Sequence, residues 1–335
     1  MVRILGTLAA LLVLGIVYQR IDAARCRRQF PPPGRLFRVN GHRLHAHCVG
    51  AGSPLVLLES GIAASSLSWT IVQPAIAKFT RVCAYDRAGL AWSDPPSCPR
   101  TFDRIVDELS GLLSHVGPHE QYVLVGHSFG CFVVCAYARR HPERMAGLVL
   151  VDPAFEWLSA TPQRVRMLRG GRQLSRLGAV LAHIGVVRAS LALLSGGAPG
   201  AARWVAKLFG ATAAQTLERL VGEVRKLPSE VHPIVQALWC QPKCFGAMAD
   251  HLLVFERSAS TAAAVPPREV PLVVISSANQ PPEHLDAHRS VAAASLHGRH
   301  VIAARSSHWV QFDEPELIVA VVQELTDAQR SATAV

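Results

Sequence analysis

Short, uninterrupted apolar runs recur along this chain, and each of them ends at a turn residue. Stretches with the helical spacing of apolar residues separate several of these runs. A strand that is apolar on both sides has to be buried on both faces, as in a parallel sheet covered by helices. The runs that we interpret as parallel strands are residues 54–59, 81–85, 121–125, 146–151, 271–275 and 300–304. The sequence therefore predicts an α/β fold with a mostly parallel central sheet and helices on both faces.

Further elements of this core are visible in the sequence. Residues 35–40 and 43–49 flank a turn and predict a β-hairpin. Residues 101–116 carry apolar residues at helical spacing, and Thr101 is placed to cap the N-terminus of that helix. Residues 129–138 are apolar on nearly every face, which predicts a fully buried helix.

The alternation of strands stops between residues 154 and 267, where the pattern becomes helical and is broken by Pro and Gly. In open α/β sheets, ligands bind at the carboxyl edge of the strands, and a helical insertion after a strand covers that edge. We therefore expect a core formed by residues 36–153 and 268–331, with a helical cap at residues 154–267.

The N-terminal segment has the composition of a membrane anchor. Residues 4–18 form an uncharged, mostly aliphatic run, and Asp22-Ala23-Ala24-Arg25 is a poor cleavage site. We expect residues 1–25 to be an uncleaved anchor and residues 26–35 to be a linker. A signal peptide that is removed on export and a buried N-terminal helix are the alternatives. The arginines after the run oppose export, so the side of the membrane stays open.

The formal net charge of +10 permits nucleic acids, anionic lipids or acidic ligands as partners. The excess of Arg and Lys lies in residues 1–35 and in the expected cap. Neither region interleaves these residues with aromatic side chains as a nucleic-acid site does, so we expect no nucleic-acid partner. The sequence also implies no obligate protein partner.

The eight cysteines do not have the spacing of a metal site. Cys240 and Cys244 form a C-x-x-x-C motif without a second cysteine pair, so a local disulfide is possible there and a zinc site is not expected. Four others lie in apolar or strand-like runs and are expected to be small core residues: Cys48, Cys83, Cys131 and Cys135.

The pentapeptide GHSFG, residues 126–130, lies between a predicted strand and the predicted buried helix. A sharp strand–turn–helix junction exposes a serine hydroxyl above the sheet, so the context favours Ser128 as a nucleophile. Gly126 and Gly130 leave room in the crowded turn. The Phe129 N–H points to where a negative oxygen would form, and the Ile62 N–H after Gly61 is the candidate for the second donor.

A serine hydroxyl needs a base and the base needs an orienting carboxylate. His308 follows the last predicted strand at the same sheet edge as Ser128, whereas His284 and His288 fall in a probable solvated helix. The acid is less clear, because residues 276–280 (SSANQ) contain none. Asp152 ends the preceding strand at the correct edge, and Glu283 or Asp286 on the following helix are the alternatives.

These features together resemble the α/β-hydrolase superfamily, in its capped branch of esterases and lipases. The resemblance covers residues 36–153 and 268–331. It rests on SGI at 60–62, AYDRAGLAWSD at 84–94, GHSFG at 126–130, AGLVLVD at 146–152 and SSHWVQFDEPE at 306–316. It implies an α/β-hydrolase fold.

Two departures from the family pattern affect the interpretation. The His-Gly that usually precedes the oxyanion donor is Ser60-Gly61, and the second glycine of the D-R-x-G-x-G-x-S segment is Ala91. An acid at the end of the earlier strand resembles some dehalogenase relatives, which supports Asp152. Those dehalogenases and the capped epoxide hydrolases use an Asp nucleophile, whereas this chain has Ser128.

The resemblance implies a serine hydrolase that cleaves carboxylic esters through an acyl-enzyme, without a metal or an organic cofactor. Trp157, Trp204 and Trp239 in the expected cap favour an apolar or lipid-like acyl substrate. Acyl transfer to an alcohol by the same triad is one alternative. A non-catalytic binding protein with the same fold is another.

Overall fold

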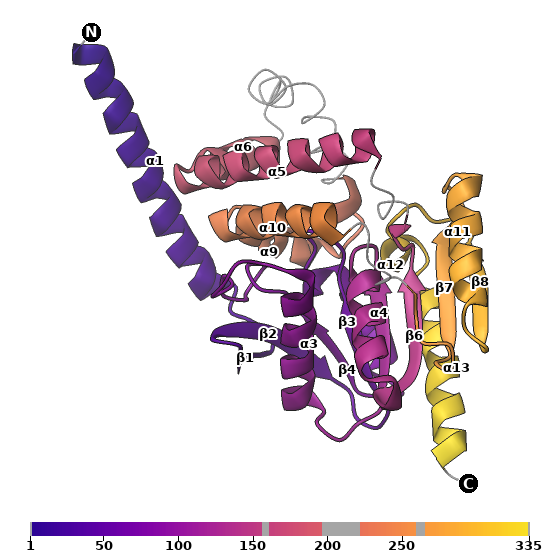
Figure 1. Ribbon diagram of the computed structural model, residues 1–335. Coiled ribbons are helices and arrows are strands. Elements are labelled where there is room, and N and C mark those ends of the chain that lie inside the picture. Colours follow the sequence, from indigo (N-terminus) through magenta and orange to yellow (C-terminus); the bar gives the residue numbers. More distant parts are fainter. Residues whose placement is uncertain (1, 156–160, 196–221, 259–264, 334–335) are drawn as a thin grey trace.

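The structure, a computed structural model, describes residues 2–155, 161–195, 222–258 and 265–333. Within these residues eight strands form one sheet in the order β1-β2-β4-β3-β5-β6-β7-β8 (Figure 1). The β1–β2 and β2–β4 pairs are antiparallel, and the other pairs are parallel. The strands are β1 (Arg35–Val39), β2 (His42–Val49), β3 (Leu55–Glu59), β4 (Val82–Tyr85), β5 (Tyr122–His127), β6 (Met145–Val151), β7 (Leu272–Ser277) and β8 (Gly298–Ala303). The mostly parallel α/β sheet that the sequence predicts is confirmed.

Helices cover both faces of this sheet, because successive strand residues alternate between two apolar cores. Leu57 of β3 packs into one core and Leu58 into the other. The helices of the first core are α3 (Phe102–Val116), α4 (Gly130–Arg140) and α11 (Pro282–Ala293). Those of the second are α2 (Val72–Ile76) and α13 (Pro315–Thr333). Short turns at η1 (Ser66–Trp69), η2 (Pro142–Arg144) and α12 (Val310–Asp313) connect these elements.

The predictions for α3 and α4 are confirmed in detail. The side chain of Thr101 accepts a hydrogen bond from the Arg104 N–H and so caps the first turn of α3. Residues 130–138 of α4 are all buried, as expected for a helix that is apolar on nearly every face. This burial holds the start of α4 firmly against the end of β5.

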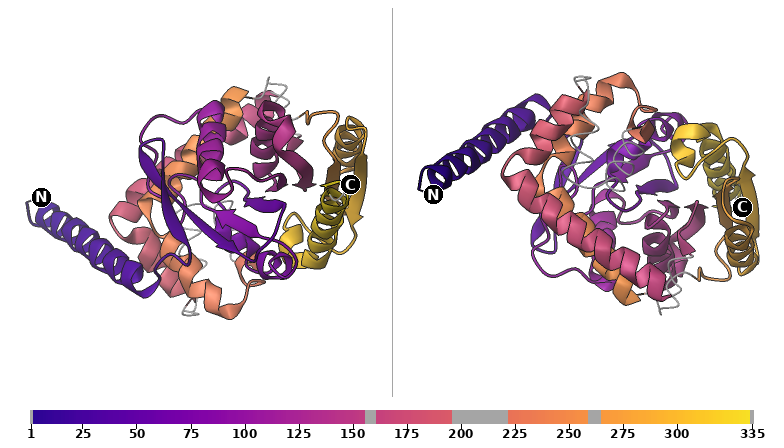
Figure 2. Two further views of the ribbon diagram at one scale, coloured as in Figure 1. Left: turned by 90° about the horizontal axis from the view of Figure 1, so that it is seen from below. Right: turned by 90° about the horizontal axis from the view of Figure 1, so that it is seen from above.

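Among the residues that the structure describes between β6 and β7 are four helices, and we call them the insert helices. They are α5 (Pro162–His183), α6 (Val186–Ser195), α9 (His232–Trp239), which follows the turn η4 (Ser229–Val231), and α10 (Pro242–Ser258). They lie above the carboxyl ends of the parallel strands (Figures 1 and 2). The helix α5 runs along α10, where Gly178 leaves space for the ring of Phe245.

The N-terminal helix α1 (Val2–Gln29) projects away from the sheet beside the insert helices (Figure 1). It is longer than expected, because it continues through residues 26–29 of the predicted linker. No Pro interrupts this helix before Pro31. Within the described residues, Leu5–Gln29 is long and apolar enough to cross a membrane. The pair Pro162–His183 and Val186–Leu193 passes that test only together, with a bend of 90° between them.

Cys48 and Cys83, which were expected to be small core residues, form a disulfide bond that was not predicted. They lie directly opposite each other on the antiparallel strands β2 and β4, with their Cα atoms 4.0 Å apart. The strand order that brings them together is not visible in their sequence positions. Cys240 and Cys244 are free and buried, so the local disulfide considered for them does not form.

Candidate active site

Ser128 lies in the sharp turn between β5 and α4. Its φ is +52°, a left-handed conformation that is costly for any residue with a side chain. The turn is held on both sides: the Ser128 N–H donates to the Val151 carbonyl at 3.0 Å, and the Ser128 carbonyl accepts from the Cys131 N–H at 3.2 Å. Backbone strain of this kind is maintained only where the surrounding structure enforces it. The strained conformation therefore identifies Ser128 as a candidate functional residue.

Three glycines allow the chain to pack closely around this turn. A Cβ atom at Gly126 would lie 2.8 Å from the backbone of Cys131, and one at Gly130 would lie 2.6 Å from the carbonyl oxygen of Glu59. A Cβ atom at Gly61 would lie 3.4 Å from the Cβ of Ser128. The loop after β3 can therefore lie directly beside the serine.

Two backbone donors are available beside Ser128. The N–H groups of Ile62 and Phe129 donate hydrogen bonds to no residue that the structure describes. Phe129 is the N-cap residue of α4, so its N–H also lies at the positive end of a helix. Two such unpaired N–H groups are what an oxyanion hole requires.

Arg87 holds the loop that carries one of these donors. Its guanidinium donates hydrogen bonds to the carbonyl oxygens of Ser60 and Gly61. In a trans peptide the C=O and the following N–H point in opposite directions. Fixing the Gly61 carbonyl on Arg87 therefore turns the Ile62 N–H away from Arg87. The same guanidinium lies 5.0 Å from the ring centre of Phe129, so one buried cation contacts both parts of the candidate oxyanion hole.

The environment of Arg87 is itself buried and paired. Glu59 accepts hydrogen bonds from Arg87 and from the hydroxyl of Tyr85. Burial raises the pKa of Glu59, and the charge of Arg87 opposes this shift without reversing it. His251 of α10 is neutral, because burial lowers its pKa well below the ordinary value, and its Nε2 accepts from Arg87 Nε at 3.3 Å. The sequence analysis missed Arg87, although its position directly after Asp86 in AYDRAG was a signal.

His308 and Asp152 form the strongest polar contact of the site. The Nδ1 of His308 lies 2.6 Å from Oδ2 of Asp152, which is fully buried and also accepts from the Ser277 N–H at 2.9 Å and the Gln280 amide at 2.7 Å. Burial alone raises the pKa of Asp152, but His308 and these donors outweigh it and lower the pKa. Asp152 is therefore ionised at neutral pH, which places a proton on Nδ1 of His308 and leaves Nε2 free to act as a base.

No hydrogen bond is formed between the ring of the candidate base His308 and the hydroxyl of the candidate nucleophile Ser128, both of which belong to the described residues. Catalytic hydrogen bonds in structures without substrate are often long and shorten when substrate binds. The structure therefore brings together Asp152 and His308, and leaves the final approach to Ser128 open.

His127 holds His308 beside the turn. The Nε2 of His127 donates to the His308 carbonyl at 2.9 Å, and the two ring centres are 4.8 Å apart. Burial, and next the charge of His308, lower the pKa of His127 to about 3, so its ring is neutral. This positioning contact was not predicted from the sequence, because it joins residues that are 181 positions apart in the chain.

The alternative acids lie elsewhere. Glu283 and Asp286 are exposed residues of α11, and Asp286 is paired with Arg289 at 2.7 Å. Neither makes a hydrogen bond or an ion pair with His308 in the described structure.

The expectation that His288 is solvated is wrong. Its Nε2 lies 2.8 Å from the Pro153 carbonyl and its Nδ1 lies 2.7 Å from the Ser276 hydroxyl. The reason is that α11 packs this face against β7 and the residue after Asp152. Burial lowers the pKa of His288, in keeping with a neutral ring.

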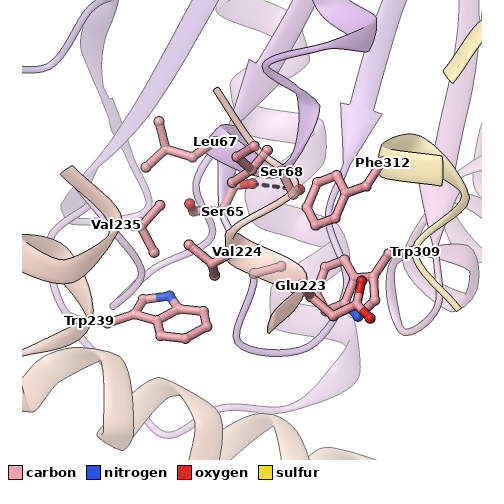
Figure 3. Close-up of a pocket in the computed structure, with 11 residues that line it drawn as sticks. Ser65, Leu67, Ser68, Glu223, Val224, Val235, Trp239, Trp309 and Phe312 are labelled. Carbon is pink, nitrogen blue, oxygen red and sulfur yellow. Dashed lines mark hydrogen bonds between the residues drawn. The ribbon is translucent and has the colours of Figure 1, made fainter. Parts of the chain in front are cut away.

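A cavity adjoins the candidate residues from the side of the insert helices. It has an empty volume of about 380 Å³, part of it open to solvent, and begins beside Ala64 and Trp309, which are near neighbours of Ile62 and His308 in the chain. Figure 3 shows apolar side chains of α9 and α12 facing Ser65 and Ser68 across this space. Ser128 and His308 do not line it. The lining residues are Ala64, Ser65, Leu67, Ser68, Glu223, Val224, Leu227, Val235, Trp239, Trp309 and Phe312.

Of the three tryptophans expected to favour an apolar substrate, Trp239 lines this cavity, whereas Trp157 and Trp204 lie outside the described residues. Among the residues that the structure describes, no group of three or more His, Cys, Asp and Glu side chains could hold a metal ion.

Comparison with characterised proteins places this geometry in a family. The chain is 38% identical over 128 residues to a 2-hydroxymuconate semialdehyde hydrolase of Pseudomonas sp. (strain CF600), covering 37% of this chain and 44% of the relative. It is 32% identical over 114 residues to a soluble epoxide hydrolase of Corynebacterium sp. (strain C12), covering 34% and 39%. The chain thus aligns with less than half of the length of these relatives.

Solved structures share the fold at low sequence identity. An esterase from Thermogutta terrifontis superposes with a TM-score of 0.60 at 20% identity, covering 88% of this chain and 99% of the esterase. The epoxide hydrolase CorEH gives 0.61 at 19% identity, covering 87% and 97%. The sequence profile of the alpha/beta hydrolase fold family matches residues 54–315. This chain therefore belongs to the alpha/beta hydrolase fold family.

Proposed function

We propose that the protein hydrolyses carboxylic esters, with Ser128 as nucleophile, His308 as general base and Asp152 as the orienting acid. The observation that carries the proposal is the 2.6 Å contact between His308 and a fully buried, ionised Asp152. The strained turn at Ser128 and the two unpaired N–H groups beside it support the same chemistry.

In the proposed reaction, Nε2 of His308 takes the proton of the Ser128 hydroxyl as the serine oxygen attacks the acyl carbon. The negative charge that develops on the former carbonyl oxygen is stabilised by the N–H groups of Ile62 and Phe129. His308 then gives the proton to the departing alcohol, which leaves an acyl-enzyme. His308 then takes a proton from water as the water oxygen attacks the acyl carbon, and gives that proton to the Ser128 oxygen as the bond between this oxygen and the acyl carbon breaks and the acid is released.

We propose an apolar or lipid-like acyl group as substrate. The cavity beside Ala64 is walled mainly by aliphatic and aromatic side chains, including Leu67, Val224 and Trp239. Ser65 and Ser68 lie on one side, and the carboxylate of Glu223 is paired with Lys226 at 2.8 Å, so an acyl chain can pack against the aliphatic and aromatic side chains. Hydrolysis of p-nitrophenyl esters of increasing chain length would test this: a preference for acetate over every longer ester would contradict it.

A covalent probe tests the nucleophile directly. A fluorophosphonate probe should label the wild-type protein, should not label Ser128→Ala, and should label the control Ser114→Ala, which removes an exposed hydroxyl on α3. Equal labelling of the wild type and Ser128→Ala would refute the serine mechanism and favour a non-catalytic binding protein.

Acyl transfer by the same triad remains an alternative to hydrolysis. A product assay with an added alcohol separates the two reactions, because a transferase yields a new ester in place of the free acid. One relative is named an epoxide hydrolase, but the Asp nucleophile that the resemblance implies for such enzymes is replaced here by Ser128.

We also propose that α1 remains attached as a membrane anchor. Buried Arg188 of α6 pairs with Asp22 at 2.6 Å and donates to Gln19 at 2.9 Å, and both partners belong to α1. Removal of α1 as a signal peptide would leave this buried guanidinium without these partners, which is strongly unfavourable. Mass determination of the protein purified from membranes tests the proposal, and a mature chain that begins after residue 22 would contradict it.

A further inference from the structure

Exposed large apolar side chains gather on two neighbouring helices. Isolated exposed apolar residues are ordinary, but a continuous group marks a surface that contacts something apolar. On α1 these residues are Leu5, Leu11, Leu12, Val13, Leu14, Val17, Tyr18 and Ile21, and on α5 they are Met167, Leu174, Leu177 and Val180.

The four residues of α5 share one side of the helix. They follow one another at intervals of seven, three and three residues, which keeps them within an arc of about 140° around an α-helix at 3.6 residues per turn. We call this side, defined by Met167, Leu174, Leu177 and Val180, the outer face of α5. The helix also contains five arginines and no acidic residue; Arg166 and Arg176 are exposed, and the exposed Arg169 is paired with Glu256 of α10 at 2.6 Å. An apolar face flanked by arginines is typical of a helix that lies in a membrane interface.

The outer face of α5 has a fixed orientation relative to α1. A Cβ atom at Gly15 of α1 would lie 2.2 Å from the Ile184 carbonyl, and the Gln19 amide donates to the Cys240 carbonyl at 3.1 Å. Together with the pairing of Arg188 described above, these contacts join α1 to α6, to the residue after α9 and to the end of α5. All three views show α1 beside the ends of α5 and α6 (Figures 1 and 2).

The position of the contacts along α1 shows how far its exposed part lies from the outer face of α5. Its contacts with the insert helices begin at Gly15, and before that point every side chain of α1 whose exposure is described is exposed. The candidate span begins at Leu5, so residues 5–14 cover about 15 Å at 1.5 Å per residue, which is about half of the roughly 30 Å of a bilayer core. A bilayer that contains this span therefore also surrounds the part of α1 that contacts the insert helices.

We propose that the outer face of α5 lies in the boundary between headgroups and acyl chains of the membrane that α1 enters. The exposed arginines beside it contact anionic headgroups, and the apolar residues enter the acyl region. The inference rests on the proposal that α1 is an anchor and does not depend on ester hydrolysis. In this arrangement the insert helices, and the edge of the sheet that they cover, lie directly on the bilayer.

Site-specific fluorescence in the full chain tests this arrangement. An environment-sensitive fluorescent amino acid is introduced in turn in place of Leu177 on the outer face of α5, Leu12 on α1 and Leu296, which is 60% exposed and lies between α11 and β8. Each protein is reconstituted into phosphatidylcholine vesicles with and without phosphatidylglycerol, and the vesicles carry a lipid with a shallow nitroxide quencher. Thermal unfolding checks that each labelled protein is folded.

We expect fluorescence at positions 12 and 177 to fall about two-fold or more in the presence of the quencher, since both sites lie within the depth that it reaches. Position 296 should not change, and phosphatidylglycerol should increase the effect at 177. Quenching at 12 alone would overturn the inference and leave the anchor intact, whereas no quenching at 12 would overturn both. Shielding of position 177 from aqueous iodide without lipid quenching would also overturn it, because it would show that a second protein surface covers α5.

Discussion

The Nδ1 of His308 lies 2.6 Å from Oδ2 of Asp152, and that carboxylate stands at the end of β6 rather than of β7. The loop after β7 contributes donors in place of an acid: the Ser277 N–H and the Gln280 amide both bind Asp152. A carboxylate that follows β6 and is held by donors at the end of β7 can orient His308 as well as a carboxylate that follows β7 itself. The assignment of Asp152 is therefore the first point to test.

Asp152→Asn should lower kcat on a p-nitrophenyl ester by about 10⁴-fold, because an amide stabilises the wrong tautomer of His308. The exposed carboxylate of Asp286 provides the matched control, and Asp286→Asn should retain normal turnover. Steady-state kinetics of both variants gives the comparison. Near-normal turnover in Asp152→Asn, with loss in Glu283→Gln or Asp286→Asn, would move the role to α11.

Arg87→Lys should lower kcat by about 10–100-fold with little change in KM. A lysine keeps the positive charge beside Glu59 but cannot hold the carbonyls of both Ser60 and Gly61, so the Ile62 donor loses its orientation. The control is Arg43→Lys, since Arg43 makes a similar paired contact with Asp94 on the exposed surface. Unchanged kcat in Arg87→Lys, at equal thermal stability, would show that Arg87 does not position the donor.

Gly130→Ala should destabilise the protein by about 1–3 kcal/mol and reduce fluorophosphonate labelling, because the new Cβ would lie 2.6 Å from a backbone oxygen of Glu59. Gly246 of α10 has no atom within 4 Å of the corresponding position, so Gly246→Ala should be stabilising by up to about 1 kcal/mol. Urea unfolding measures both changes. Equal stability of the two variants would mean that the turn can relax around a side chain.

His127 should make the stability of the protein depend on pH below about 6.5. The pKa of His127 is about 3 in the folded protein, against 6.5 for an ordinary histidine. The stability that its neutral ring contributes is therefore fully present above pH 6.5. Between pH 6.5 and pH 3 the unfolded chain binds a proton that the folded protein does not. The free energy of unfolding therefore falls by about 1.4 kcal/mol for each unit by which the pH is lowered.

The variant His127→Gln removes this proton while keeping an N–H that can donate to the His308 carbonyl. As the pH is lowered from 6.5 to 5, the free energy of unfolding in urea should fall less steeply for this variant than for the wild type. The two slopes should differ by about 1.4 kcal/mol per pH unit. The buried His251 and His288 contribute equally to both proteins and cancel in the comparison. Parallel pH profiles for the two proteins would contradict the lowered pKa of His127.

The fold could be predicted because its signals are local. A strand that is buried on both faces is apolar throughout, as in β3 and β6, and a cap such as Thr101 lies next to the helix that it begins. Ser128 and His308 could be proposed for a similar reason. Ser128 follows directly on β5 and His308 lies in the loop after β8, and the carboxyl ends of parallel strands meet at one edge.

The remaining features depend on contacts between distant parts of the chain. The bond between Cys48 and Cys83 requires the register of β2 on β4, and the burial of His288 requires the packing of α11 on β7. Arg87 acts on a loop that precedes it by about 26 residues, so its role appears only once β3 and β4 are neighbours. Side-chain periodicity does not report such pairings.

The connection of the insert helices to the sheet has a mechanical consequence. The chain leaves β6 at Asp152 to form the insert helices and returns to the sheet at β7, whose end holds the same carboxylate through the Ser277 N–H. A pull on the insert helices is therefore transmitted to β6 and β7, whose ends together hold the carboxylate of Asp152. A shear of β6 against β7 would loosen the hydrogen bond between the Ser277 N–H and Asp152, so the orientation of this carboxylate is coupled to tension in the polypeptide above it.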